Sequence, residues 1–453
     1  MTDRLAQVRG PELETTKPAI TTLSAAPDVP ALGARFLGYL SADGLNYLLG
    51  FVIYGWLVRV LTNQQYGQLS VATSVYQALM MVAALGLDLT GPRLLALSGG
   101  DPMDFARKAQ NLRLAVAALI CGPLQLGGAF IAYHRGQTLL ATVILASFAM
   151  VLARALDLTY LAVALRLPAP LAKTRALGLL AYLLMLIVCT PLVRQHLWLV
   201  PLLNAVGVTL GRVRLARLLR RHSPRSRHSL KIRSWEIVSQ GIRAGGGQLL
   251  LLVMQTGDVV LLVRYVSTDA VGQYAMISRL YLLGMAVLGA MFNTFLPEIV
   301  RVSQHASKLH AQFRIFLFAN LILGVAGWAC FYGLAARLSE LLAHRALPTV
   351  HAITPIFAVV FLLMAVAAPF LSMLPTLHRG TEYMAGIASA VVLLLGLDLA
   401  LMPRYGVVGA AYAQAVVTAG LAIFSISVYF KHLHALPLAA AIQSPINGPA
   451  GMG

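Results

Sequence analysis

The chain has 453 residues, of which 58% are hydrophobic and 11% are charged, and its mean hydropathy is +0.76. A soluble domain carries roughly 25% charged residues, so this composition excludes an ordinary soluble fold. The formal net charge of +19 indicates an anionic partner. The three cysteines lie in apolar runs without Cys-x-x-Cys spacing, and we expect neither a disulfide nor a metal site.

A membrane-spanning helix needs about 20 apolar residues. The sequence contains about twelve such runs, near 36–58, 68–92, 112–133, 138–163, 176–193, 197–211, 244–263, 272–297, 315–336, 352–376, 383–402 and 407–430. The sixth run is short, and we expect its helix to extend into the arginine-rich segment that follows it. Residues 1–32 are polar and contain four prolines, which predicts a disordered tail and no cleavable signal peptide. We therefore predict an all-α integral membrane protein with about 12 transmembrane helices.

The basic residues are divided unevenly between the two sides of these predicted helices. If the N-terminus is cytoplasmic, the inside segments hold 26 Lys and Arg residues and the outside loops hold seven. This bias follows the positive-inside rule and predicts that both termini are cytoplasmic. The densest basic segment, 212–243, is interpreted as an anchor against anionic inner-leaflet lipids. It lacks the interleaved aromatic residues of a nucleic-acid surface, so we expect no nucleic-acid partner.

The two halves of the chain are similar to each other. A shift of 205 positions places Arg59 on Arg264, Gly67-Gln68 on Gly272-Gln273, Tyr76 on Tyr281 and Pro92 on Pro297. The shift corresponds to six spans, which preserves their direction, so the predicted repeat is parallel with a pseudo-two-fold axis along the membrane normal. The predicted units are a cytoplasmic tail (1–32), a six-helix bundle (33–220), a basic linker (221–240), a second six-helix bundle (241–430) and a cytoplasmic tail (431–453). Two such bundles around a central cavity are typical of an alternating-access transporter.

Three short motifs follow one another along the chain. They are Tyr66-Gly67 with Leu85-Gly86-Leu87-Asp88, then Val271-Gly272-Gln273-Tyr274, then Pro403-Arg404-Tyr405-Gly406 with Gly409. On these motifs, residues 33–430 resemble the polysaccharide flippases of the multidrug/oligosaccharidyl-lipid/polysaccharide exporter superfamily. The resemblance implies transport of a polyprenyl-pyrophosphate-linked oligosaccharide from the inner to the outer leaflet of the bacterial cytoplasmic (inner) membrane. It also implies a role in lipopolysaccharide or exopolysaccharide biosynthesis, as a monomer beside polysaccharide polymerase and export proteins.

Only two of the 35 Lys and Arg residues, Arg154 and Arg279, lie deep inside predicted spans. A charge in hydrocarbon is costly unless it has a partner or faces a watery cavity. We predict a cluster of Asp43, Arg154 and Asp157 in the first bundle and an ion pair between Asp258 and Arg279 in the second. These five residues would line the substrate cavity. The alternative is that they only neutralise one another and support helix packing.

Four charges at inner helix ends are candidate gate residues: Asp88, Arg93, Glu298 and Arg301. Arg93 and Glu298 are repeat-equivalent and opposite in charge, so they could meet across the two bundles. The alternative is that all four are ordinary interfacial charges. All eleven histidines fall in loops or at span ends, so a coupling ion, H+ or Na+, would depend on the buried aspartates. Asp398 is expected to reach water, and we expect no catalytic residue and no cofactor.

Three other functions stay open at the level of sequence. A multidrug or cation exporter of the same superfamily would favour an acidic chamber, whereas this chain places two arginines in its spans. A membrane glycosyltransferase or polymerase needs acidic groups in substantial outer loops, and the predicted outer loops hold only Asp269 and Glu340. The third alternative is an inactive scaffold for a polysaccharide assembly complex.

Overall fold

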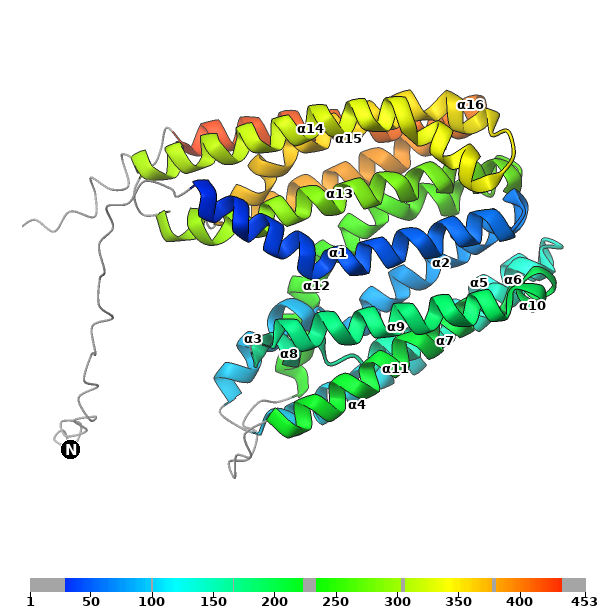
Figure 1. Ribbon diagram of the computed structural model, residues 1–453, viewed down its shortest axis with the longest axis horizontal. Helices are drawn as coiled ribbons and strands as arrows, with labels where there is room; N and C mark the ends of the chain where they lie inside the picture. Colours follow the sequence, from blue (N-terminus) through cyan, green and yellow to red (C-terminus); the bar gives the residue numbers. More distant parts are fainter. Residues whose placement is uncertain are drawn as a thin grey trace, which may run out of the picture.

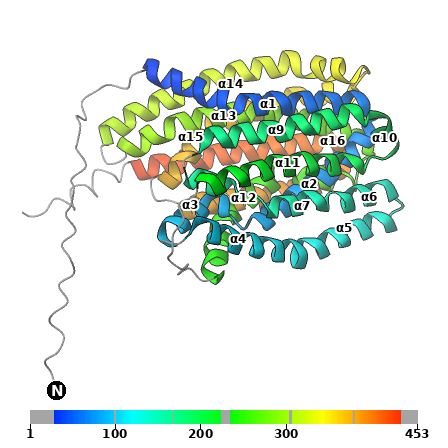
Figure 2. The same ribbon diagram turned by 60° about the horizontal axis from the view of Figure 1, so that its bottom comes forward.

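The computed structural model describes residues 29–98, 101–165, 167–222, 234–302, 306–376 and 380–433. Within these ranges the chain forms helices joined by short turns and contains no strand. The long helices run roughly parallel to the longest axis of the molecule (Figure 1), and a view turned by 60° shows the same bundle from below (Figure 2). The first helix begins at Val29, inside the segment predicted as a tail, whereas 1–28 and 434–453 lie outside the described residues.

The first half of the described chain, called the N-lobe here, consists of eleven α-helices and one π-helical segment. They are α1 (Val29–Val60), α2 (Asn63–Ala84), α3 (Leu87–Ser98), α4 (Pro102–Val116), η1 (Ala117–Cys121), α5 (Gly122–His134), α6 (Thr138–Ala146), α7 (Phe148–Ala155), α8 (Thr159–Ala164), α9 (Pro168–Val188), α10 (Thr190–Gln195) and α11 (Leu199–His222). Several predicted spans are therefore interrupted. The second is divided into α2 and α3, the third into α4, η1 and α5, and the fourth into α6, α7 and α8.

The second half, called the C-lobe, has longer helices. They are α12 (Ser234–Leu262), α13 (Thr268–Val302), α14 (Ala306–Ala343), α15 (Pro348–Thr376) and α16 (Gly380–Leu433). α16 contains two of the predicted spans. They are separated by a kink at Gly406, whose backbone angles are non-helical (φ 56°, ψ −129°). Nine stretches of the described chain are long and apolar enough to cross a membrane, and α16 supplies one of them. Counting α16 twice and adding α1 and the more polar α2 gives the twelve spans that the sequence predicts.

The two ends of the bundle differ in charge. α11 finishes with exposed Arg217, Arg220 and Arg221, and this end is called the basic end. The turns at 61–62 and 344–347 lie at the other end, called the turn end. In Figure 1 the basic end is on the left and the turn end on the right.

Local sequence explains where the second span starts and where it breaks. Thr62 accepts a hydrogen bond from the N–H of Gln65 (3.2 Å), and the Gln65 side chain accepts one from the N–H of Thr62 (3.1 Å). This reciprocal capping box fixes the start of α2. α2 ends at Leu85 and Gly86, which have positive φ angles of 51° and 59°. Glycine adopts this conformation without strain, and the break leaves carbonyl groups of α2 that need new donors.

One of the contacts between the lobes forms where α2 packs against α13 near the turn end. A Cβ at Gly67 would overlap the carbonyl oxygen of Thr268, and one at Gly272 would overlap that of Asn63, so backbone meets backbone. Gly67 and Gly272 are equivalent positions of the internal repeat. Equivalent residues meet only near the axis that relates two repeats, so this contact agrees with the predicted parallel arrangement.

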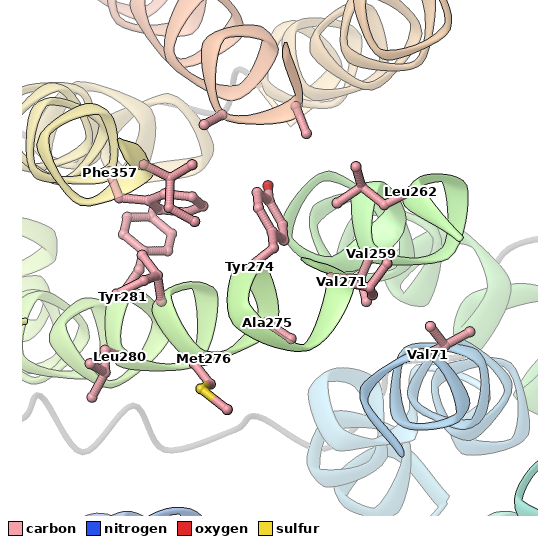
Figure 3. Packing of buried hydrophobic residues seen from close by; sticks show 14 of the residues in the cluster. Val71, Val259, Leu262, Val271, Tyr274, Ala275, Met276, Leu280, Tyr281 and Phe357 are labelled. Carbon is pink, nitrogen blue, oxygen red and sulfur yellow. The ribbon is translucent and has the colours of Figure 1, made fainter. Parts of the chain in front are cut away.

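The largest apolar core extends across both lobes. Figure 3 shows Val71 of α2 facing Val259 of α12 and Val271 of α13. Deeper in the C-lobe, the ring centres of Tyr274 and Phe357 lie 5.4 Å apart in an edge-to-face contact. Lipid tails are as apolar as these side chains, so close packing, more than exclusion of water, holds the helices together.

Gly272→Ala should separate α13 from α2, because the added Cβ would overlap the Asn63 carbonyl. Overpacking of this kind costs roughly 1–3 kcal/mol, so we expect a lower Tm in detergent micelles. Gly289→Ala in the same helix is the control, since a Cβ there meets no atom within 4 Å. Its Tm should be unchanged or slightly higher. Equal Tm values for the two variants would contradict the glycine contact.

Candidate functional site

Two pockets follow one another along the same three helices, α1, α9 and α11. The basic-end pocket has a volume of about 380 Å³, and its polar lining includes Asn46, Arg154, Asp157, Thr174, Arg175 and Arg212. The central pocket has a volume of about 180 Å³, and its polar lining includes Tyr54, Tyr66, Tyr76, Tyr182, Asn204 and Arg279. Leu179 of α9 lines the first pocket, and Tyr182, less than one turn further along, lines the second. The two pockets are therefore neighbours along these helices.

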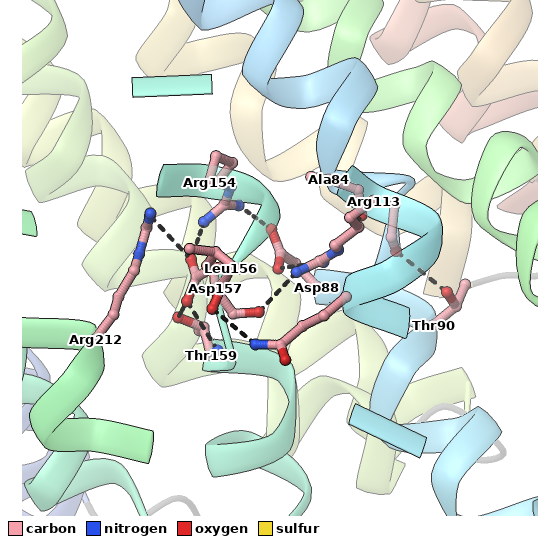
Figure 4. Close-up of polar contacts among 11 residues, drawn as sticks. Ala84, Asp88, Thr90, Arg113, Arg154, Leu156, Asp157, Thr159 and Arg212 are labelled. Atoms are coloured by element: carbon pink, nitrogen blue, oxygen red, sulfur yellow. Dashed lines mark hydrogen bonds and ion pairs between the residues drawn. The ribbon is translucent and has the colours of Figure 1, made fainter. Parts of the chain in front are cut away.

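Five charged residues form a network beside the basic-end pocket (Figure 4). Arg154 of α7 forms ion pairs with both Asp157 and Asp88. Arg113 of α4 lies 3.5 Å from Asp88, and Arg212 of α11 lies 3.4 Å from Asp157. Two carboxylates thus hold three guanidinium groups from three helices, which leaves the network with a net charge of +1.

The carboxylates of this network lie at breaks in membrane helices. Asp88 is in the first turn of α3, directly after the Leu85–Gly86 break, where a negative charge stabilises a helix N-terminus. Asp157 lies between α7 and α8, and it accepts hydrogen bonds from the N–H and the hydroxyl group of Thr159 (3.0 and 2.8 Å). The interruptions of these two spans therefore place their acidic residues beside the same arginines.

Arg113 supplies donors to the backbone at both breaks. Its Nε donates to the carbonyl of Ala84, the last residue of α2 (3.0 Å), and its Nη1 donates to the carbonyl of Asp157 (2.8 Å). Its side chain is fully buried, and the guanidinium carbon lies 4.9 Å from the centre of the Tyr160 ring. Because lipid offers no hydrogen bonds, carbonyls freed by a helix break need such an internal donor.

Arg279 is the cation of the central pocket. It extends from α13 of the C-lobe, whereas the other lining residues come from α1, α2, α9 and α11 of the N-lobe. Four buried tyrosines surround the same space: Tyr54, Tyr66, Tyr76 and Tyr182. No carboxylate whose side chain the structure describes lies within ion-pair distance of Arg279, so its charge faces the pocket without a counter-ion from these residues.

Two further carboxylates are buried in the C-lobe. Asp258 of α12 accepts hydrogen bonds from the hydroxyl of Tyr274 and from the N–H of Val259 (2.7 Å). Asp398 of α16 is 0% exposed, and neither of its carboxylate oxygens has a hydrogen-bond partner in the described chain. Two sequence predictions are therefore wrong. Asp258 accepts a hydrogen bond from Tyr274 and does not pair with Arg279, because the two helices turn these charges to different faces. Asp398 is buried by its neighbours and does not reach water.

The structure brings together part of the predicted cluster. Arg154 and Asp157 are paired, and Asp88 completes the pairing of Arg154 inside the N-lobe, so these contacts of Asp88 do not cross between the lobes. The other predicted residues have side chains outside the described part of the structure: Asp43, Arg93, Glu298 and Arg301. Their roles in a cavity or a gate stay predictions. Among the described residues, no group of three or more His, Cys, Asp or Glu side chains could hold a metal ion.

Sequence reasoning missed Arg113 and Arg212, because both lie at the ends of apolar runs, where an arginine usually reaches water. One signal could have found them. Asp88 and Asp157 both lie in or beside apolar runs, and two carboxylates at such positions need more cations than Arg154 alone. The tyrosine-lined pocket had no comparable signal, since its tyrosines come from three helices.

Comparison with known proteins identifies the family of this chain. The model of the family described as polysaccharide biosynthesis protein matches residues 32–303, which is more than half of the chain. No curated protein matches the sequence.

Solved structures share the fold at low sequence identity. An inward-facing multidrug resistance MATE family transporter of the MOP superfamily has a TM-score of 0.69 and 14% identity, over 88% of this chain and 96% of that chain. The lipid II flippase MurJ in an inward closed conformation has a TM-score of 0.64 and 11% identity, over 90% and 91%. A MOP superfamily transporter from Pyrococcus furiosus has a TM-score of 0.55 and 13% identity, over 90% and 92%. These likenesses confirm the predicted fold, a multi-pass membrane protein with twelve helices in two lobes.

Arg113→Met should destabilise the protein strongly, because it leaves the carbonyls of Ala84 and Asp157 without their donor and removes one of the two cations beside Asp88. Breaking a buried charge network in this way costs roughly 3–5 kcal/mol. Arg107→Met is the control, since Arg107 pairs with Asp104 at the surface, where the side chains are 75% and 52% exposed. Such a pair contributes about 0–1 kcal/mol. We expect a much lower Tm in detergent for the first variant and a nearly unchanged Tm for the second; the reverse order would refute the structural role of Arg113.

Proposed function

The chain belongs to the polysaccharide biosynthesis protein family, and from this premise we propose that it is a lipid-linked oligosaccharide flippase. In this proposal it moves a polyprenyl-pyrophosphate-linked oligosaccharide from the inner to the outer leaflet of the bacterial cytoplasmic membrane. Translocation occurs by alternating access, for the biosynthesis of a cell-surface polysaccharide. The protein works as a transporter and not as an enzyme.

One observation carries the choice of cargo, namely the charge of the two pockets. Their lining includes Arg154, Arg175, Arg212 and Arg279 but a single carboxylate, Asp157. Asp157 is already bound by two of these arginines. A chamber with this excess of positive charge favours an anionic ligand, and guanidinium groups bind phosphate oxygens in bidentate geometry.

The central pocket fits the polar head of such a lipid. Arg279 offers an uncompensated cation to a pyrophosphate, and the tyrosines offer flat faces and hydroxyl groups to sugars. The prenyl chain stays in the surrounding lipid. Because Arg279 belongs to the C-lobe and the tyrosines to the N-lobe, a ligand in this pocket would contact both lobes at once. Binding would then favour conformations in which the lobes are close together.

The same proposal implies an orientation in the membrane, a set of partners and a site for a coupling ion. The basic end faces the cytoplasm and the anionic lipids of the inner leaflet, with both termini on that side. The protein acts as a monomer beside the polymerase and export proteins of the pathway. A coupling ion, H+ or Na+, would use the buried carboxylates Asp258 and Asp398, which lie in the C-lobe away from the arginine-lined pockets.

A cation or multidrug exporter is the second candidate. It is favoured by the same two buried carboxylates, which are acidic groups without a basic partner in the described chain. A glycosyltransferase or polymerase is less favoured, because Asp157, the single pocket carboxylate, is engaged by arginines and by Thr159 and is not free to act as a base.

Arg279→Ala should slow translocation of a fluorescent polyprenyl-pyrophosphate oligosaccharide in proteoliposomes. Loss of hydrogen bonds from a charged donor, worth about 1.5–3 kcal/mol, corresponds to roughly a tenfold to hundredfold lower rate. Arg264→Ala is the matched control, because Arg264 is an exposed C-lobe arginine that lies against Tyr265 and outside both pockets. Its rate should equal that of wild type.

The same vesicles distinguish the two candidates. If wild type leaves several lipid-linked glycans in place but pumps a cationic dye, the exporter is correct and the flippase proposal fails. If wild type moves the glycolipid and Arg279→Ala is folded but as fast as wild type, the flippase stands and Arg279 is not its anion site.

A further inference from the structure

At the turn end, one arginine reaches from the C-lobe to the N-lobe. Arg345 lies between α14 and α15, and its Nη2 donates a hydrogen bond to the carbonyl of Leu61, just after α1 (2.9 Å). The same nitrogen lies 3.5 Å from the carbonyl oxygen of Val58. The last carbonyls of a helix have no partner within it, and a cation at this position also interacts favourably with the helix dipole. Arg345 therefore caps α1 from the opposite lobe.

The turn that carries Arg345 is fixed to the C-lobe by its own contacts. The Glu340 side chain accepts hydrogen bonds from the N–H of Leu347 (3.1 Å) and pairs with Nε2 of His351 (2.9 Å). The Gln273 side chain of α13 accepts a hydrogen bond from the N–H of Thr349 (3.0 Å). Leu347 is fully buried. A movement of the C-lobe must therefore carry Arg345 with it.

Further contacts join the lobes near this turn. The Tyr54 hydroxyl of α1 donates to the carbonyl of Met276 on α13 (3.2 Å). Leu342 of α14 lies against Gly55 of α1, where an added Cβ would come within 3.1 Å of its Cδ2. Together with the α2–α13 glycine contact, these residues close the boundary between α1–α2 and α13–α14.

The central pocket lies directly against this boundary. Tyr54, Leu57 and Tyr66 line the pocket. The carbonyls that face Arg345, those of Val58 and Leu61, follow Leu57 within about one turn of helix. An opening of the pocket toward the turn end must part α1 and α2 from α13 and α14. The same movement must break the hydrogen bonds of Arg345.

From this geometry we propose that Arg345 is a gate residue that holds the central pocket closed at the turn end. Among the described residues, the other boundary contacts named here are packing contacts and a neutral hydrogen bond from Tyr54, whereas Arg345 contributes a charged donor, and charge-assisted hydrogen bonds are the stronger class. Its removal shifts the protein toward conformations open at the turn end and leaves the pocket lining unchanged. The proposal concerns the movement of the lobes, and its test needs no substrate. It can therefore fail while the proposed cargo is correct, and the proposed cargo can be wrong while the gate is correct.

The first experiment measures access to the pocket from the turn end. Cys121, Cys189 and Cys330 are replaced, Ser70→Cys places a thiol in the central pocket, and oriented vesicles receive a membrane-impermeant maleimide on the turn-end side. Arg345→Ala should label about tenfold faster than the parent, a factor that corresponds to about 1.4 kcal/mol. Arg337→Ala, which removes an exposed arginine from the same end of α14, should label at the parental rate. Equal rates for all three proteins would overturn the proposal.

A second measurement covers the case in which Arg345→Ala does not fold. Spin labels at Gln64 and Ala346, two exposed positions on opposite lobes at the turn end, report the separation of the lobes. Arg345→Gln keeps an amide donor but loses the charge, and it should add a population at longer distance in double electron–electron resonance. The Arg337→Ala control should keep the parental distribution. A parental distribution for Arg345→Gln as well would count decisively against a gate at this position.

Discussion

A helix that breaks inside a membrane exposes carbonyl groups that water cannot reach, and the N-lobe contains two such breaks side by side. α2 ends at Ala84, and a break at Asp157 separates α7 from α8. Arg113 donates to a backbone carbonyl at each of them. Its charge is in turn held next to Asp88, which also pairs with Arg154. The carbonyls that the two breaks expose thus have a donor, and the bent helices can pack around the two pockets.

Charge is distributed in three different ways along the molecule. In the N-lobe, three arginines and two aspartates nearly neutralise one another. At the boundary between the lobes, Arg279 stands without a carboxylate partner in the described chain and faces a tyrosine-lined pocket. In the C-lobe, Asp258 and Asp398 are buried without a basic partner among the described residues. In the proposed function, these three charge patterns correspond to a structural network, an anion site and a site for a coupling cation.

The boundary between the lobes is built for close approach. Gly67 and Gly272 let two backbones touch, and side chains of α1 and α14 interlock beside them. Packing contacts of this kind lose roughly a quarter to a half of their attraction when a gap of about 0.5–1 Å opens, so the closed boundary resists small separations. Arg345 adds a directional bond to the closed arrangement, at the end opposite to the one where the sequence had placed candidate gate charges.

The sequence by itself determined the twelve spans, their grouping into two lobes and the position of Arg154 and Arg279 deep inside two of the spans, because hydropathy and spacing are local properties. It also paired Gly67 with Gly272 as equivalent positions and placed Arg154 three residues from Asp157, close enough to pair. Only the tertiary structure decided which charges meet. Asp258 and Arg279 lie at similar depth on consecutive helices, yet they point to different faces, and Arg212 reaches the Asp157 carboxylate across 55 positions of sequence. The rotation of a helix about its axis is set by the side chains of its neighbours, and that information is spread over the whole chain.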